Sequence, residues 1–153
     1  MYEMLFHGKM LDTGEWVEGF YHYRDYVFNG ETVRKHYILP INAQDAVEVN
    51  PNTVGRSTGL SDKNGKKIFE GDILQDEGIM GGVSRCVIEF GLFNVYGTDR
   101  VSEVGFFLYW ESDKRKYHKY GNLVYWIQER EAVCVGNIHD NPELLEGGVS
   151  DGV

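Results

Sequence analysis

The sequence has few of the features that stabilise secreted or membrane proteins. Its 153 residues include only two cysteines, Cys86 and Cys134, and both lie in apolar stretches. A small secreted fold usually carries four or more cysteines, so we expect buried free thiols and no disulfide framework. No apolar run approaches the roughly 18 residues of a membrane-spanning helix, and the N-terminal residues lack the pattern of a signal peptide. We therefore expect a cytoplasmic protein with no membrane partner.

Helical periodicity is also nearly absent. No segment places apolar residues at i, i+3, i+4 and i+7 over three turns. Proline occurs only three times, whereas there are 19 glycines, 10 tyrosines and 8 phenylalanines. Many glycines with many aromatic residues indicate short strands joined by turns and bulges. The pattern predicts a mainly β fold, of β-rich α+β type, in which Asn141-Pro142 begins a short C-terminal helical turn.

Two Asn-Gly pairs predict β-hairpins, because both central residues of a type I′ turn need a positive φ angle. Asn29-Gly30 has apolar and β-branched residues on both sides, and Asn64-Gly65 precedes Ile68-Phe69. We predict strands over residues 2–7, 15–23, 25–29, 32–39, 67–76, 83–91, 104–111, 122–127 and 131–137. A boundary near Pro51 would separate an N-terminal antiparallel β region (1–50) from a barrel-like β unit (53–146), with a disordered tail (147–153).

The charge balance argues against a nucleic-acid partner. The formal net charge is −9, and a negative surface repels phosphate backbones. One locally basic stretch, Lys114-Arg115-Lys116 with Lys119, is interpreted as a solvated loop. A continuous basic groove that joined these residues to Arg100 would instead favour a nucleic-acid-associated accessory protein.

No motif for catalysis, cofactor binding or metal binding is present. The sequence contains neither of the glycine-rich phosphate-binding motifs, no C-x-x-C and no H-E-x-x-H, and its histidines lack ligand spacing. We therefore assign no catalytic, cofactor-binding or metal-ligating residue and expect no cofactor. The sequence leaves open whether the protein is an enzyme, and the balance favours a non-enzymatic one.

Two weaker pairs of residues were considered as reactive sites. Cys134 and His139 would be a nucleophile and base only if the strand end brought them together, and the valines beside Cys134 favour a structural thiol. Glu70 and Asp72 share a strand face and could bind a cation or serve in acid–base chemistry. The simpler interpretation is that Asp72 accepts backbone N–H groups in a tight turn.

Three blocks of sequence, in a fixed order, resemble the YopX family of phage- and prophage-encoded proteins. The first is Phe6-His7-Gly8-Lys9 followed by Gly14-Glu15-Trp16. The second contains Thr58-Gly59-Leu60, Asp62-Lys63-Asn64-Gly65-Lys66 and Glu70-Gly71-Asp72-Ile73. The third runs from Gly136-Asn137-Ile138 to Asn141-Pro142-Glu143-Leu144-Leu145. One departure is Arg56-Ser57, where relatives often have Gln-Tyr before Thr-Gly-Leu, so any role of that tyrosine is in doubt here.

The resemblance implies an N-terminal sheet region followed by a small SH3-like barrel, in a bacterial cytoplasm. It supplies no reaction and no catalytic residue. The signature positions are interpreted as structural, because turns, a bulge and a helix start explain them. They are Thr58, Gly59, Leu60, Asp62, Asn64, Gly65, Gly71, Asp72, Gly136, Asn137, Asn141 and Pro142.

The leading hypothesis is a non-enzymatic protein-interaction module that contacts an unknown host or phage protein, or that forms a homo-oligomer. Small barrels often bind through grooves lined with aromatic residues. The weak candidates for such a surface are Tyr109, Trp110, Tyr120, Tyr125 and Trp126. The alternatives are the nucleic-acid-associated protein and an enzyme with an unrecognised carboxylate or metal site.

Overall fold

The structure is a computed structural model that describes residues 3–78, 81–93, 103–110 and 122–146. Its strands form antiparallel sheets, which confirms the predicted mainly β class. The chain divides into two compact units, residues 1–57 and 58–153. The predicted boundary residue Pro51 lies in the first unit, in a 3₁₀ turn, η1 (Pro51–Thr53). The predicted disordered tail, 147–153, lies outside the described residues.

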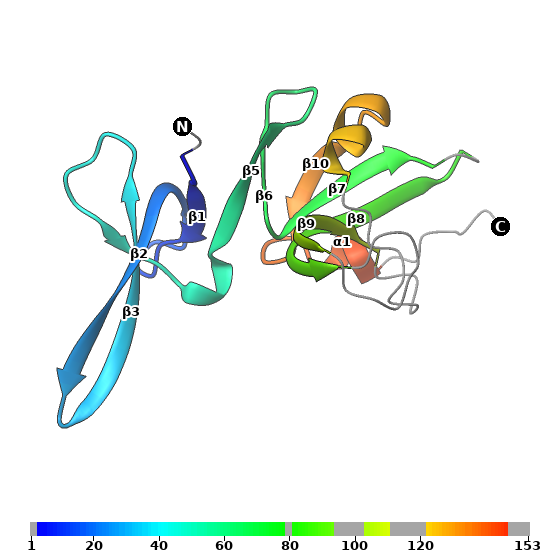
Figure 1. Cartoon of the computed structure of the whole chain (residues 1–153). Helices are drawn as coiled ribbons and strands as arrows, with labels where there is room; N and C mark the ends of the chain where they lie inside the picture. Colours follow the sequence, from blue (N-terminus) through cyan, green and yellow to red (C-terminus); the bar gives the residue numbers. More distant parts are fainter. Residues whose placement is uncertain (1–2, 79–80, 94–102, 111–121, 147–153) are drawn as a thin grey trace. The chain divides into compact units, whose positions relative to one another are not determined.

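Four antiparallel strands form most of the first unit, in the order β4-β3-β2-β1 (Figure 1). Their bounds are β1 (Phe6–Lys9), β2 (Trp16–Phe28), β3 (Glu31–Pro40) and β4 (Val47–Glu48). β5 (Gly55–Ser61) begins beside β1, where Gly55 and Arg56 pair with His7 and Phe6. The two strands predicted over 15–23 and 25–29 are one continuous strand, because β2 pairs with β3 at every position from Gly19 to Phe28.

The β2–β3 turn has the predicted type I′ geometry. Asn29 has a φ angle of 50° and Gly30 one of 79°, and Phe28 pairs with Glu31 across the turn. At the other end of the same hairpin the two backbones approach closely. A Cβ atom on Gly19 would overlap the Leu39 carbonyl group, so only glycine fits there. Ile38 and Val49 are buried beneath this part of the sheet.

The second unit contains a four-stranded antiparallel sheet in the order β10-β7-β8-β9. Its strands are β7 (Asp72–Glu77), β8 (Val83–Phe93), β9 (Glu103–Tyr109) and β10 (Val133–Asn137). A short strand, β6 (Lys67–Phe69), neighbours β5. The strand predicted over 67–76 is interrupted at Glu70-Gly71, where Gly71 adopts a φ angle of 91°. The described strands show an open sheet, and closure into a barrel is not seen among them.

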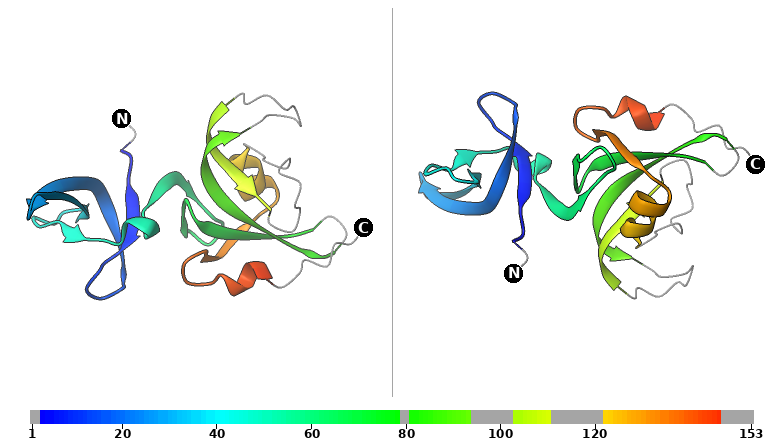
Figure 2. Two further views of the ribbon diagram at one scale, coloured as in Figure 1. Left: turned by 90° about the horizontal axis from the view of Figure 1, so that it is seen from below. Right: turned by 90° about the horizontal axis from the view of Figure 1, so that it is seen from above.

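The strand predicted over residues 122–127 is wrong, because this segment is helical. A helical turn leads into a π-helical segment, η2 (Tyr125–Glu129), in which Arg130 N–H donates to the Tyr125 carbonyl (3.1 Å). The side chain of Asn122 accepts the Tyr125 N–H (3.0 Å) and so supports the first turn. The helix lies against the concave side of the curved sheet in both views of Figure 2.

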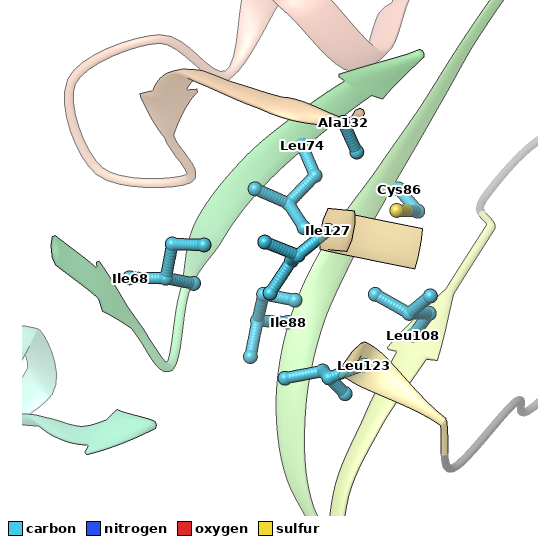
Figure 3. Packing of buried hydrophobic residues seen from close by; sticks show 8 residues of the cluster. All are labelled: Ile68, Leu74, Cys86, Ile88, Leu108, Leu123, Ile127 and Ala132. Carbon is cyan, nitrogen blue, oxygen red and sulfur yellow. The ribbon is translucent and has the colours of Figure 1, made fainter. Parts of the chain in front are cut away.

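Packing explains why this segment is helical. Leu123 and Ile127 are four residues apart, a spacing that places both on one helix face. Figure 3 shows them directed into the cluster formed by the sheet residues Ile68, Leu74, Cys86, Ile88 and Leu108, with Ala132. Ile88, Leu74 and Leu108 are completely buried. The predicted C-terminal helical turn is confirmed as α1 (Glu143–Glu146).

Candidate functional site

The β2–β3 hairpin continues beyond the strands that flank it. β1 pairs with β2 only as far as Gly19, and β4 pairs with β3 only at Tyr37 and Ile38. Residues 20–37 are here called the arm, and their outer part, residues 24–35, forms a two-stranded ribbon (Figure 1). Large side chains on the arm are exposed: Phe20 41%, Tyr23 51%, Tyr26 42%, Val27 77%, Phe28 70% and Val33 45%.

One face of the arm carries several polar contacts within the chain. We call it the paired face; it carries Tyr21, Tyr23, Asp25 and Val27 with their β3 partners. Arg34 donates two hydrogen bonds to Asp25 (2.7 and 2.9 Å) and lies 3.9 Å from the Tyr23 ring centroid. The hydrogen bond from Arg34 lowers the pKa of the Asp25 carboxyl. The Tyr21 hydroxyl and His36 Nδ1 are 2.7 Å apart.

The opposite face combines aromatic rings with cations. We call it the aromatic face; its side chains are those of Phe20, His22, Arg24, Tyr26 and Phe28 with their partners Leu39, Tyr37, Lys35, Val33 and Glu31. The Tyr26 and Tyr37 hydroxyl groups are 3.1 Å apart, and this hydrogen bond lowers the pKa of Tyr26 and raises that of Tyr37 to about 12. The Arg24 guanidinium lies 5.8 Å from the Tyr37 ring and Lys35 Nζ lies 5.9 Å from the Tyr26 ring.

A cavity of about 330 Å³ opens at the base of the aromatic face. It is lined by His22, Arg24, Tyr37, Leu39, Gln44, Asp45 and Ala46. The ring of His22 stacks on Tyr37 with the centroids 5.4 Å apart. The cavity thus presents an arginine, an acid and a stacked aromatic pair beside the exposed ribbon.

The aromatic residues predicted as a binding surface are partly used in packing. Trp110 and Trp126 pack against the core cluster with ring centroids 5.0 Å apart, and Trp110 Nε1 donates to Ser84 Oγ (3.0 Å). Tyr109 is half-buried, Tyr125 is exposed, and Tyr120 lies outside the described residues. Trp110 and Trp126 therefore serve at least partly in packing, whereas six large side chains of the arm are more than 40% exposed.

The signature residue Asp62 joins the β5–β6 turn to β10. It is buried, and its Oδ1 accepts the N–H groups of Asn64 (2.9 Å) and Lys66 (3.0 Å). Its Oδ2 accepts the N–H of Cys134 (3.0 Å). In the same turn Gly65 has a φ angle of 79° and its N–H donates to the Asp62 carbonyl (2.9 Å). These three hydrogen bonds of the Asp62 carboxylate are all with backbone N–H groups, which is a structural use of the acid.

The other signature blocks also make backbone contacts. The Thr58 hydroxyl donates to the Ile68 carbonyl (2.8 Å), Gly59 has a φ angle of 75°, and Leu60 packs against the core cluster. At the chain's end Asn141 Oδ1 accepts the N–H of Asn137 (3.3 Å). Asn141 thus closes the turn that precedes Pro142 and α1. Gly136 is required beside it, because a Cβ atom there would lie 2.7 Å from Asn141 Cγ.

Asp72 and Cys134 are placed for structural use. Asp72 Oδ2 accepts the Phe69 N–H (2.8 Å) across the Glu70-Gly71 bend, and burial raises the pKa of Asp72 to about 6. Burial, with the nearby charge of Asp72, raises the pKa of the Cys134 thiol to about 11. A thiol with such a pKa is protonated at neutral pH, whereas a nucleophilic cysteine needs a thiolate.

Because the pKa of Asp72 is raised in the folded state, its charged carboxylate should lower the free energy of unfolding near neutral pH. A substitution that removes the charge should remove this loss. In the unfolded chain this carboxyl ionises near 3.8, so between that pH and 6 the folded state binds more protons and stability falls as pH rises. Asp72→Asn keeps an oxygen for the Phe69 N–H without the charge. We expect it to be more stable than the native chain at pH 7.5, by up to about 3 kcal/mol, with no advantage at pH 4. Urea unfolding at both pH values measures this, and an equal loss of stability at both would contradict it.

Among the described residues, no three histidine, cysteine or acidic side chains are grouped so that they could hold a metal ion. None of the helices described is long and apolar enough to cross a membrane. The residues of the predicted basic groove, Arg100, Lys114, Arg115, Lys116 and Lys119, lie outside the described residues. Arg56 and Ser57, the two residues that depart from the family pattern, are half-buried at the start of β5. The Ser57 N–H donates to the Leu5 carbonyl (2.8 Å).

Sequence reasoning located the hairpin of the arm but not its exposure. From Tyr21 to Phe28, most side chains of β2 are aromatic or apolar, and they lie on both faces. Such a strand is expected to be covered on both sides. Only the pairing of β1 and β4, which ends at the base of the hairpin, reveals that no described strand pairs with its outer part.

The fold and the turn signatures define a family of mainly β proteins. A mainly β chain with these turn signatures matches the family model described as YopX protein over residues 12–146. The chain therefore belongs to the YopX protein family. No curated protein matches it. Among solved structures it is similar to protein EF1440 from Enterococcus faecalis, with 22% identity and a TM-score of 0.46 over 95% of this chain and 99% of the other.

Proposed function

We propose that this protein is a non-enzymatic protein-interaction module, derived from a phage or prophage, that contacts a host or phage protein in the bacterial cytoplasm. Membership of the YopX family supports the phage origin through the known sources of that family. The SH3-like barrel expected for the second unit belongs to the same proposal. Its open described sheet, β10-β7-β8-β9, has the antiparallel connections that such a barrel would need.

The arm is the observation that carries the proposal. A two-stranded hairpin is at best marginally stable in water without packing on a third element. This one places Val27 and Phe28 at its end with 77% and 70% of their surface exposed. Exposed apolar side chains gathered on one part of a small protein often mark an interaction site. We infer that the arm is the surface through which the protein binds.

The chemistry of the described residues favours binding over catalysis. The buried acids Asp62, Asp72 and Asp76 accept hydrogen bonds from backbone or arginine N–H groups, and Cys134 has a raised pKa. No described pair of these groups meets in a cavity as an acid and base would. A nucleic-acid-associated role is the second candidate, since the aromatic face carries Arg24 and Lys35. The net charge of −9 opposes it.

The arm is tested by a double substitution at its end. Val27→Ser/Phe28→Ser removes the two most exposed apolar side chains and should leave the fold intact, since neither is buried. The matched control is Leu92→Ser/Val104→Ser, which alters residues of the second unit with 60% and 66% exposure. In affinity capture from phage-infected cells we expect the arm variant to lose at least about 90% of the recovered partner, and the control to retain it. Equal recovery by both variants would remove the arm from the proposal.

A further inference from the structure

The aromatic face of the arm carries a pattern that is complementary to itself. Its cross-strand pairs follow one another along the ribbon: Arg24 with Lys35, then Tyr26 with Val33, then Phe28 with Glu31. Two cations thus lie on one side of the Tyr26–Val33 pair. An exposed aromatic ring and an acid lie on the other side at the same spacing, about 7 Å for two residues.

Two symmetric ways of stacking this face on a second copy differ in their charges. If the two-fold axis ran along the strands, β2 would lie over β3 of the partner and Arg24 would meet Lys35, a repulsive contact. If the axis runs along the Tyr26–Val33 pair, β2 lies over β2 and β3 over β3 in opposite directions. Lys35 then meets Glu31 of the other copy, and Arg24 meets Phe28 of the other copy. The second arrangement pairs opposite charges and places a cation on a ring.

The cavity at the base of the face fits the same arrangement. The turn Asn29-Gly30 lies one step beyond Phe28, so in the antiparallel stacking it reaches the position of His22 and Tyr37 in the other copy. That position is the cavity of about 330 Å³ lined by these residues and by Asp45. A polar Asn-Gly turn suits a cavity that offers a carboxylate, an amide and an arginine.

We propose that the partner of the aromatic face is a second copy of this chain, with the two arms stacked antiparallel about a two-fold axis through Tyr26 and Val33. This inference rests on the proposed function, in which the arm is the binding surface, and adds a second copy of the chain as the occupant of the aromatic face. The net charge of −9 supports this occupant over nucleic acid, because a negative chain repels phosphate groups. The paired face is left outward, where its Arg34–Asp25 pair is already satisfied within the chain. Because the stacked surface is small, we expect weak association, with a dissociation constant on the order of 10 μM.

Charge reversal within the proposed pair tests the inference on the purified full chain. Sedimentation equilibrium across about 1–300 μM spans the expected dissociation constant. Lys35→Glu and Glu31→Lys should each weaken association at least about tenfold, because each places like charges together twice in the symmetric contact. The double variant, Lys35→Glu/Glu31→Lys, should recover most of the loss. The control Thr32→Lys adds a cation on the paired face, beside Glu31, and should leave association unchanged.

Recovery in the double variant can arise only between copies. Residues 31 and 35 of one strand are about 13 Å apart, beyond the screening length at physiological salt. Lys35 also lies 3.4 Å from Glu48 of its own chain, but Glu31→Lys does not restore that contact. A chain that is monomeric at all concentrations, or additive loss without recovery, would overturn the inference. Loss of a cellular partner by the Val27/Phe28 variant would still stand in that case, so the two failures are distinguishable.

Discussion

Replacing Asp62 by alanine is expected to lower the free energy of unfolding by about 4 kcal/mol. Its carboxylate accepts three backbone N–H groups, those of Asn64, Lys66 and Cys134, at 2.9 to 3.0 Å. The residue is only 6% exposed, so water cannot replace all three bonds. The loss should also separate β10 from the β5–β6 turn. Urea unfolding followed by tryptophan fluorescence measures it, since Trp110 and Trp126 lie beside the core of the second unit.

Two further variants test whether the stability depends on the Asp62 carboxylate itself or on any substitution in the β5–β6 turn. Asp62→Asn keeps one oxygen acceptor and should lose roughly half as much stability. Lys63→Ala, at the exposed neighbouring position, should change it by less than about 0.5 kcal/mol. If Asp62→Ala were as stable as Lys63→Ala, the capping role of this signature acid would be wrong.

Replacing Arg130 by methionine should destabilise the second unit by roughly 3–5 kcal/mol. Its Nη2 lies 2.8 Å from Asp76 Oδ2 and 2.7 Å from the Glu77 carbonyl. The Asp76 side chain is 2% exposed and that of Arg130 23% exposed. Methionine keeps the apolar stem but leaves a buried carboxylate without its cation, which is the costly part of breaking such a pair.

The double variant Arg130→Met/Asp76→Asn tests whether the unpaired Asp76 charge causes this loss of stability. It removes both charges, so it should be more stable than Arg130→Met alone by about 2 kcal/mol. Thermal and urea unfolding of the native chain, both single variants and the double variant complete the cycle. Additive losses would mean that the two side chains act independently, against the geometry.

Local chemistry made much of the β architecture predictable. Asn29-Gly30 specifies a turn with two positive φ angles whatever surrounds it, and the structure has that turn. The strand predicted over residues 83–91 is likewise present, as β8 (Val83–Phe93). The interruption at Gly71 was predicted only as a bulge, because the sequence does not show that Ile88 and Ile138 both bond to this glycine's backbone.

Tertiary packing decided what the sequence could not. Residues 122–127 are rich in strand-forming side chains, yet Leu123 and Ile127 pack onto the concave side of the sheet only as a helix. For the same reason the sequence did not show that Trp110 and Trp126, two of the candidate surface residues, pack against the core cluster. The sequence predicted the hairpin of the arm but not its exposure, because exposure depends on where β1 and β4 stop pairing.

The central claim, that the arm is the contact surface of this protein, is tested most directly by photo-crosslinking in infected cells. A photoreactive amino acid at position 28 replaces a phenylalanine that is 70% exposed, and one at position 104 replaces a valine that is 66% exposed. We predict crosslinked adducts, to a second copy or to a host or phage protein, from position 28 and few or none from position 104. Adducts from position 104 alone, with none from position 28, would contradict the account.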